Sequence, residues 1–319
     1  MTETEIRLLK NLEFNFGRFV MTAVKDPDVT DIMLNPDGRL WTQAGGEMTH
    51  VGEIDRARAM QIVSLVGSSM DVTVREESPI VRGVVPVYGH RFEGMIPPAV
   101  DAPAFAIRKK AVRVFPLEEY VSQGIMPEAV YRAIDEAIVG YKNMLVIGGT
   151  GSGKTTLVNA IIERMARLCN QDRLAIIEDA AELQSQSPNV IFLRSSLHIT
   201  ARHLVEACMR LNPTRILFGE VINGAALDLL KSWNTGHPGG LSTIHANSAE
   251  GGLFRLQSLI SEVSVTPMHE LIGEAVDLCI FITARGKSRR ITQVAKVDRY
   301  DSVLKRYELE YVHNEAQGG

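Results

Sequence analysis

A chain of 319 residues is long enough for about two domains, and its 45% hydrophobic and 23% charged residues are typical of a soluble globular protein. The net charge of −4 argues against the basic surface of a nucleic-acid-binding protein, so we expect no direct nucleic-acid binding. Cys169, Cys208 and Cys279 lie far apart without a CxxC pair, which argues against a disulfide framework or a zinc knuckle and suits a reducing cytoplasm.

The first residues predict an amphipathic helix. Apolar residues recur at helical spacing from Ile6 to Phe19, with charged residues between them. The chain has neither the unbroken apolar segment of a signal peptide here nor a run of about 18 apolar residues anywhere. We expect the apolar stripe to pack on its own domain; docking on a membrane or a partner is the alternative.

Residues 1–107 predict a mixed α+β domain. The segment 54–66 is helical by pattern, and 81–100 predicts a β-hairpin with a turn at its middle. The segment 104–110 predicts one more strand. Pro116 lies within 108–124, which we predict to be the linker to a second domain.

Residues 125–319 predict an α/β domain. Short apolar strands alternate with amphipathic helices, the pattern of a mostly parallel sheet covered on both faces. The last apolar segments predict strands that close or flank this sheet. The expected helices are 127–140, 153–168, 200–211 and 225–233, and the expected strands are 143–149, 173–179, 190–194, 215–220 and 241–246.

The loop GGTGSGKTT follows an expected strand, opens an expected helix and fits G-x-x-x-x-G-K-[ST]. Glycines let backbone N–H groups turn inward around a polyphosphate, and the helix start adds its positive dipole end. Lys154 would bring its charge to the β- and γ-phosphates, and Thr155 would offer a hydroxyl to Mg²⁺. The loop therefore predicts ATP and Mg²⁺ as ligands, held by Gly148, Gly149, Thr150, Gly151, Ser152, Gly153, Lys154, Thr155 and Thr156.

Carboxylates end two of the expected strands. Glu178 and Asp179 follow one strand and Glu220 follows another, and the carboxyl ends of parallel strands are where ligands bind. Glu178 is a candidate to polarise the attacking water, and Glu220 is a candidate to orient Mg²⁺ through a water molecule. For Asp179 a solvated or capping role is equally open, and for Glu182 we favour that role.

Two histidines, His237 and His245, lie eight residues apart among small polar residues. A metal site lacks a third ligand, so a core position and a nucleotide phosphate are the better alternatives. His245 stands near the carboxyl end of the expected strand 241–246, and we favour it as a contact to the γ-phosphate or to water. His237 lies in a Gly/Pro turn; we keep it as a catalytic candidate, with a core role equally open.

The chain contains, in this order, the segments GGTGSGKTT, IIEDAAEL, RILFGEV and NTGHPGGLSTIHANSA. Together they resemble the secretion traffic ATPases of type II secretion, type IV pili and type IV secretion. The sequence is most similar to the TrbB-type conjugal transfer ATPases of plasmid mating systems, notably in LDLLKSWNTGHPGGLSTIHANSA. The resemblance covers nearly the whole chain and is strongest from about 141 to 260.

The resemblance implies a RecA-like P-loop ATPase domain with a smaller N-terminal domain, assembled as a homo-hexamer. It implies a cytoplasmic protein, peripheral on the inner face of the bacterial inner membrane, where ATP hydrolysis drives pilus assembly or substrate export in conjugation. Other cytoplasmic ATPases and inner-membrane components of a type IV secretion machine are the implied partners, and contact with the inner-membrane surface is an open alternative.

Particular residues match the motifs of the family. IIED matches its aspartate box, FGE its Walker B box, and the two histidines its histidine box. Arg91 in HRFEGMIPPA and Arg108 in FAIRKK match arginines that reach the phosphates from the N-terminal domain. Arg210 matches the first arginine of the motif LRxRPDRI and is a further catalytic candidate.

The chain departs from the family at two motifs. Ile222 and Ala225 replace a usual arginine and glutamate, and Asn212 and Thr214 alter the usual RPDRI. Joint loss of an arginine and a glutamate can be nearly neutral, because no charge is left alone. Three alternatives stay open: a pilus or type II secretion motor, a nucleotide-gated scaffold with negligible turnover, and a nucleic-acid translocase.

Overall fold

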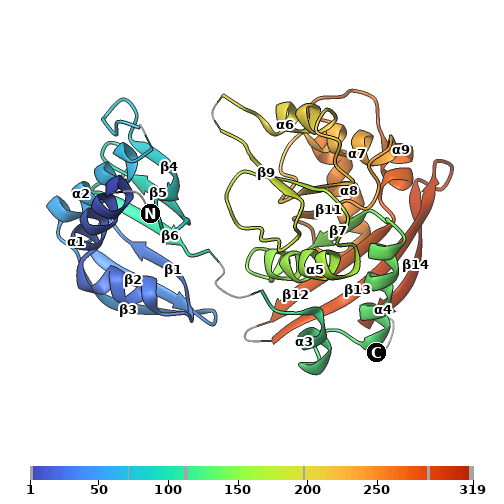
Figure 1. The fold of residues 1–319 in the computed structure, drawn as a ribbon, viewed down its shortest axis with the longest axis horizontal. Coiled ribbons are helices and arrows are strands. Elements are labelled where there is room, and N and C mark those ends of the chain that lie inside the picture. Colours follow the sequence, from blue (N-terminus) through green and yellow to red (C-terminus); the bar gives the residue numbers. More distant parts are fainter. Residues whose placement is uncertain (1–2, 71, 111–113, 197, 286–287, 316–319) are drawn as a thin grey trace. The chain divides into compact units, whose positions relative to one another are not determined.

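The chain forms two compact units, Met1–Val112 and Arg113–Gly319 (Figure 1). Each unit has its own sheet and its own hydrophobic packing. In the part of the chain that is described, no helix has both the length and the apolar character needed to cross a bilayer. The computed structural model describes residues 3–70, 72–110, 114–196, 198–285 and 288–315.

The smaller unit is a six-stranded antiparallel sheet in the order β3-β2-β1-β6-β5-β4, with two helices packed on it. Buried side chains from both helices and from the strands share one core, which includes Leu12, Ile62 and Ile107. This unit has the α+β fold that the sequence predicts. Its elements are α1 (Glu3–Lys25), β1 (Val29–Leu34), β2 (Arg39–Ala44), β3 (Glu47–Glu53), α2 (Arg56–Ser68), β4 (Ile80–Val85), β5 (His90–Met95) and β6 (Ala104–Arg108).

The larger unit is built on an eight-stranded sheet in the order β14-β13-β12-β7-β11-β10-β8-β9. The strands from β12 to β9 are parallel, and β13 and β14 extend the sheet as antiparallel strands. The predicted α/β fold is therefore confirmed. Its strands are β7 (Met144–Ile147), β8 (Leu174–Glu178), β9 (Val190–Arg194), β10 (Arg215–Phe218), β11 (Leu241–Ile244), β12 (Leu278–Arg285), β13 (Ser288–Asp301) and β14 (Arg306–Asn314).

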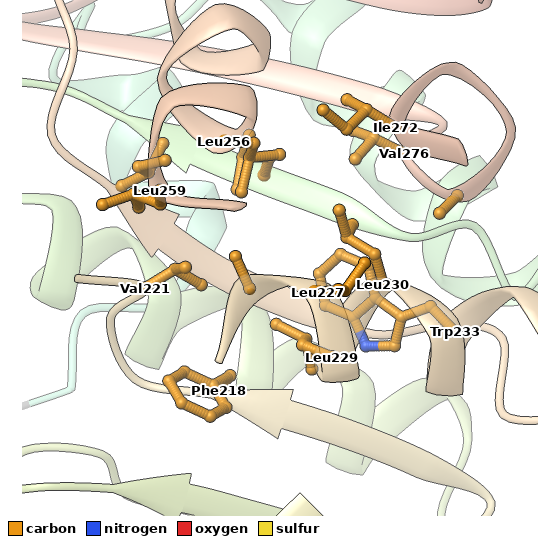
Figure 2. Packing of buried hydrophobic residues seen from close by; sticks show 14 of the residues in the cluster. Phe218, Val221, Leu227, Leu229, Leu230, Trp233, Leu256, Leu259, Ile272 and Val276 are labelled. Carbon is orange, nitrogen blue, oxygen red and sulfur yellow. The ribbon is translucent and has the colours of Figure 1, made fainter. Parts of the chain in front are cut away.

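Helices cover both faces of this sheet, and successive residues of β7 point to different cores. Leu145 and Ile147 belong to one core, and Met144 and Val146 belong to the other. Figure 2 shows part of the first core, to which Trp233, Leu256 and Ile272 belong. The helices of the first core are α6 (Ala201–Cys208), α7 (Ala226–Asn234), α8 (Ala249–Ile260) and α9 (His269–Ala275), and those of the second are α3 (Leu117–Ser122), α4 (Glu128–Val139) and α5 (Lys154–Leu168).

The expected linker 108–124 contains a helix that the sequence pattern does not reveal. Helix α3 buries Leu117 and Tyr120 in the second core, and it contacts α4 and α5. A helix of six residues spans less than two turns, which is too short for a helical period to be recognised. The last part of this segment therefore belongs to the larger unit.

A buried arginine ties together the amino edge of the large sheet. Arg215, at the start of β10, is fully buried, and its Nε donates to Asp172 Oδ2 at 2.6 Å. Its Nη2 donates to the carbonyl of Ile138 at 2.9 Å, and its Nη1 donates to that of Gly239 at 3.4 Å. The ring of Tyr141 lies 4.2 Å from the guanidinium carbon, and its hydroxyl donates to Asp172 Oδ1 at 3.0 Å. With a further contact of 3.4 Å from Nη2 to Cys169 Sγ, at the C-cap of α5, the network joins the ends of α4 and α5 to β10 and to the turn before β11.

Candidate nucleotide-binding site

The predicted phosphate loop lies at the carboxyl edge of the large sheet, between the end of β7 and the start of α5. Gly151 and Gly153 have φ of 72° and 97°, in the left-handed region that favours glycine. A Cβ on Gly148 would lie 2.5 Å from the carbonyl oxygen of Ile282, so this position also requires glycine. The glycines thus shape a loop whose last residue caps the amino end of a helix, a geometry suited to an anion.

Lys154 is held at the centre of this loop. Its side chain is buried, and Nζ donates to the carbonyls of Gly148 at 2.9 Å and Gly149 at 3.0 Å. Burial lowers the pKa of Lys154, and the negative charge of Glu220 opposes that shift. The ammonium group therefore faces the loop interior, where phosphate oxygens would bind.

His245 and Glu220 meet Lys154 at the same edge. Both ring nitrogens of His245 lie within reach of Lys154 Nζ, Nδ1 at 3.3 Å and Nε2 at 3.4 Å. His245 Nε2 also lies 2.7 Å from Glu220 Oε1, which forms an ion pair when the ring is protonated. The ends of β7, β10 and β11 thus bring together a cation, an imidazole and a carboxylate, as the parallel strands predict.

Glu178 ends β8 at this edge and is almost fully buried. Its Oε2 accepts the backbone N–H groups of Glu182 at 3.2 Å and Leu183 at 2.9 Å. Its Oε1 has no hydrogen bond among the described residues, and Arg194 Nε lies 4.0 Å away. Burial raises the pKa of Glu178, although the two N–H groups and Arg194 favour the charged form. A buried carboxylate with a raised pKa and an unused oxygen can accept a proton from water.

Glu182 lies closer to the site than a solvated role would place it. Thr155 Oγ1 donates to Glu182 Oε2 at 3.5 Å, so the carboxylate stands beside the hydroxyl that the loop motif assigns to Mg²⁺. The sequence signal for this placement is its spacing of four residues after Glu178, in the turn that wraps around that side chain. Asp179, by contrast, is exposed and accepts a hydrogen bond from Ser195.

Arg210 and His237 lie at the opposite edge of the sheet. Arg210 precedes β10 and is exposed, and His237 precedes β11, with Nδ1 3.0 Å from the carbonyl oxygen of Pro213. Because β10 and β11 run parallel to β7, residues before these strands lie at the amino edge, and the phosphate loop lies at the carboxyl edge. The structure does not bring these two residues to Lys154 of the same chain.

Arg91 and Arg108 belong to the smaller unit. They are register partners on the adjacent strands β5 and β6, so their side chains start from neighbouring positions on the same face. Arg108 Nε donates to Asp31 Oδ1 at 2.9 Å. The two arginines thus form a basic pair on this sheet.

Of the two altered positions after Glu220, one lies at the surface and the other packs against the first core. Ile222 is 52% exposed, and Ala225 packs against the first core at the start of α7. Both residues are apolar, so neither position carries a charge.

The substitution His245→Ala is expected to lower turnover by about 100-fold and to leave ATP binding nearly unchanged, because in its predicted role this histidine would contact the γ-phosphate or the attacking water. Steady-state hydrolysis and equilibrium binding of ATP measure the two effects. His50→Ala, on an exposed strand of the smaller unit, is the control and should change neither. Wild-type turnover in His245→Ala would show that this histidine has no role in hydrolysis.

Comparison with known proteins identifies the family of this site. The family described as "Type II/IV secretion system protein" matches residues 91–293. The "Probable conjugal transfer protein TrbB" of Sinorhizobium fredii is 44% identical over 305 residues, which cover 95% of this chain and 93% of that protein. The "Conjugal transfer protein TrbB" of Rhizobium radiobacter is 45% identical over 295 residues, 92% of this chain and 91% of that protein.

A solved structure shares the fold. The ATPase DotB of Yersinia pseudotuberculosis matches with a TM-score of 0.63 at 16% identity, over 93% of this chain and 80% of that one. At this identity the likeness concerns the fold alone. The family match spans the hairpin strand β5, the phosphate loop, both carboxylate strands and the histidine segment. The chain therefore belongs to the family of type II/IV secretion system proteins.

Proposed function

We propose that this chain hydrolyses ATP with Mg²⁺ and thereby powers a type IV secretion system in conjugative plasmid transfer. The observation that carries the proposal is the meeting of Lys154, His245 and Glu220 at the phosphate loop, with buried Glu178 on the same sheet edge. The process follows from the two TrbB relatives, which are named for conjugal transfer and align with more than nine-tenths of this chain.

The residues at the loop fit Mg²⁺. Oxygen atoms are its preferred protein ligands, and Thr155 lies in the first turn of α5 with Glu182 beside its hydroxyl. Thr155 would hold the ion directly, and Glu220 would hold it through a water molecule. When bound, the ion neutralises charge on the β- and γ-phosphate oxygens.

The chain's own residues divide the rest of the reaction. The loop amides and Lys154 bind the phosphates and fix their orientation. Glu178 takes a proton from the attacking water through its unused Oε1, and His245 contacts the γ-phosphate or that water. Each of these groups comes from the end of a different strand, so the sheet sets their spacing.

Arg210 and His237 would act across a subunit boundary. They lie at the far edge of their own sheet, so a neighbouring chain must present them to a nucleotide, as in a homo-hexameric ring. Arg91 and Arg108 would reach the phosphates from the smaller unit. In this assembly the protein works on the cytoplasmic face of the inner membrane, beside other ATPases and inner-membrane components of the secretion machine.

A nucleotide-gated scaffold with negligible turnover is the second candidate. The observation that favours it is the pair Ile222 and Ala225, two residues beyond Glu220 and at the start of the next helix. A change there can uncouple closure from hydrolysis and leave the binding loop intact.

Steady-state ATP hydrolysis, with light scattering on the same samples, separates the two candidates. We expect turnover by the wild-type chain, a loss of at least about tenfold in Glu220→Gln from weaker positioning of Mg²⁺, and particles of the same mass in both. Binding of ATP without turnover above the Glu220→Gln level would support the scaffold and contradict the motor. Absence of ATP binding would contradict both.

A further inference from the structure

The β12–β13 hairpin carries an arginine that rests on the phosphate loop. Arg289 pairs with Ala284 near the start of β13. A Cβ placed on Gly153 would lie 3.3 Å from Arg289 Cδ and 3.4 Å from its Nε. The arginine side chain therefore covers the glycine that caps the amino end of α5, directly before Lys154.

The charge of Arg289 is not neutralised by any of the described residues. Among them it has no hydrogen bond or ion pair, and it is exposed. Its neighbour Arg290 has a partner, because its Nη1 lies 3.5 Å from Glu315 Oε1. The positive charge of Arg289 also reaches Tyr120, where it opposes the rise in the pKa of that phenol caused by burial.

This position is unfavourable for a cation on its own. The amino end of α5 has the positive end of the helix dipole, and Lys154 adds a second positive charge next to it. A guanidinium group there is stabilised when an anion binds between them, and its planar fork matches two phosphate oxygens. The charge arrangement thus points to an anionic ligand that touches Arg289 as well as the loop.

The order of the strands indicates which part of a bound nucleotide would lie beside Arg289. The loop follows β7, which lies between β12 and β11 in the sheet. His245, Glu220 and Glu178 end β11, β10 and β8, all on one side of β7, so the γ-phosphate belongs on that side. Arg289 stands on the other side, on the hairpin that follows β12. A nucleotide whose γ-phosphate faces Glu178 therefore extends its α-phosphate and ribose toward Arg289.

We propose that Arg289 binds the α- or β-phosphate of the nucleotide and so holds nucleoside diphosphate as well as triphosphate. This inference rests on the proposed ATPase function. It assigns Arg289 to nucleotide affinity, whereas His245, Glu220 and Glu178 serve the chemical step. The effect of the arginine must therefore appear with ADP, which has no γ-phosphate.

The test is the binding of ADP to the full-length chain, measured by titration calorimetry, together with kcat and KM for ATP. In Arg289→Gln the Kd for ADP is expected to rise at least about tenfold, with KM for ATP rising in parallel and the loss falling on KM more than on kcat. Arg289→Lys keeps the charge without the fork and should recover part of the affinity. Arg290→Gln, one residue along and facing the opposite side, is the matched control and should bind ADP like the wild type.

The outcomes separate this inference from the function on which it rests. If the wild-type chain binds neither ADP nor ATP, the proposed function fails. If the wild type binds ADP and Arg289→Gln binds it equally well, the inference alone is overturned. The inference is likewise overturned if kcat falls while the Kd for ADP is unchanged, or if Arg290→Gln weakens ADP binding as much as Arg289→Gln.

Discussion

A Glu178→Gln variant is expected to hydrolyse ATP about 10²–10⁴-fold more slowly than the wild type, while its larger unit unfolds at a higher temperature at neutral pH. Both effects have the same cause. Glu178 is buried, two backbone N–H groups hold one of its oxygens, and the other has no hydrogen bond among the described residues. Glutamine keeps the shape and an acceptor oxygen, but it cannot take a proton from water and carries no buried charge.

The stability effect depends on pH in a defined direction. Burial raises the pKa of Glu178 above that of the unfolded chain. The folded state therefore favours the protonated carboxyl, and this stabilisation is present at acidic pH and is lost as the pH rises through the raised pKa. Glutamine stays neutral at every pH, so the unfolding temperature of the variant should exceed that of the wild type near pH 7 and approach it below about pH 4.

The hydrolysis rate of the wild type should follow the same ionisation. Turnover falls as the pH drops through the pKa of Glu178, because only the carboxylate accepts the proton. Asp179→Asn is the matched control, since this neighbouring acid is exposed, and we expect a far smaller loss of rate. Equal losses in the two variants, or near-normal hydrolysis in Glu178→Gln, would assign the proton transfer to another group.

An Arg215→Ala variant is expected to lose about 3–5 kcal/mol of the free energy of unfolding of the larger unit. The substitution leaves Asp172 buried without its 2.6 Å partner and removes the donors to the carbonyls of Ile138 and Gly239. A buried charge left alone costs far more than the pair contributes. Urea denaturation, followed by circular dichroism, measures the loss.

A surface ion pair of similar length provides the comparison. Lys142 Nζ lies 2.9 Å from Asp277 Oδ1, but the lysine side chain is 57% exposed. Lys142→Ala should therefore cost no more than about 1 kcal/mol, because water screens exposed pairs. The double variant Arg215→Ala/Asp172→Asn should recover part of the loss by removing the lone charge. If Arg215→Ala costs as little as Lys142→Ala, the buried network is not a main source of stability.

The sequence predicts the phosphate side of the site because the information there is local. A strand, a glycine-rich loop and a helix are consecutive, and parallel strands put Glu178, Glu220 and His245 at one edge. The same rule applies to Arg210 and His237: both precede their strands, so their place at the opposite edge could have been recognised from the sequence. The family motifs alone suggest a catalytic role for these two residues, but they do not say at which edge of the sheet the residues lie.

Other parts depend on contacts between distant segments. Arg289 reaches Gly153 from a hairpin more than a hundred residues later, and Arg194 reaches Glu178 from the edge strand β9. Arg194 has no sequence pattern that marks it. Arg289 lies in a local basic cluster with Arg285, Lys287 and Arg290, for which a solvated face or phosphate contacts are both possible from sequence, and only the strand order places it beside the loop. Helix α3 is not predicted for a different reason. Its six residues are too few to show a helical period, and its burial depends on α4 and α5.

The Arg215 network makes the two edges of the large sheet different, and we expect the amino edge to be the more rigid one. At the amino edge, the fully buried guanidinium of Arg215 contacts the ends of two helices and the turn before β11 from the start of a strand. The carboxyl edge contains the glycine-rich loop and the half-exposed side chains of Glu220 and His245. Because local opening is most frequent where buried contacts are few, we expect slow amide exchange at the edge that holds Arg215 and faster exchange at the edge where the phosphates would bind.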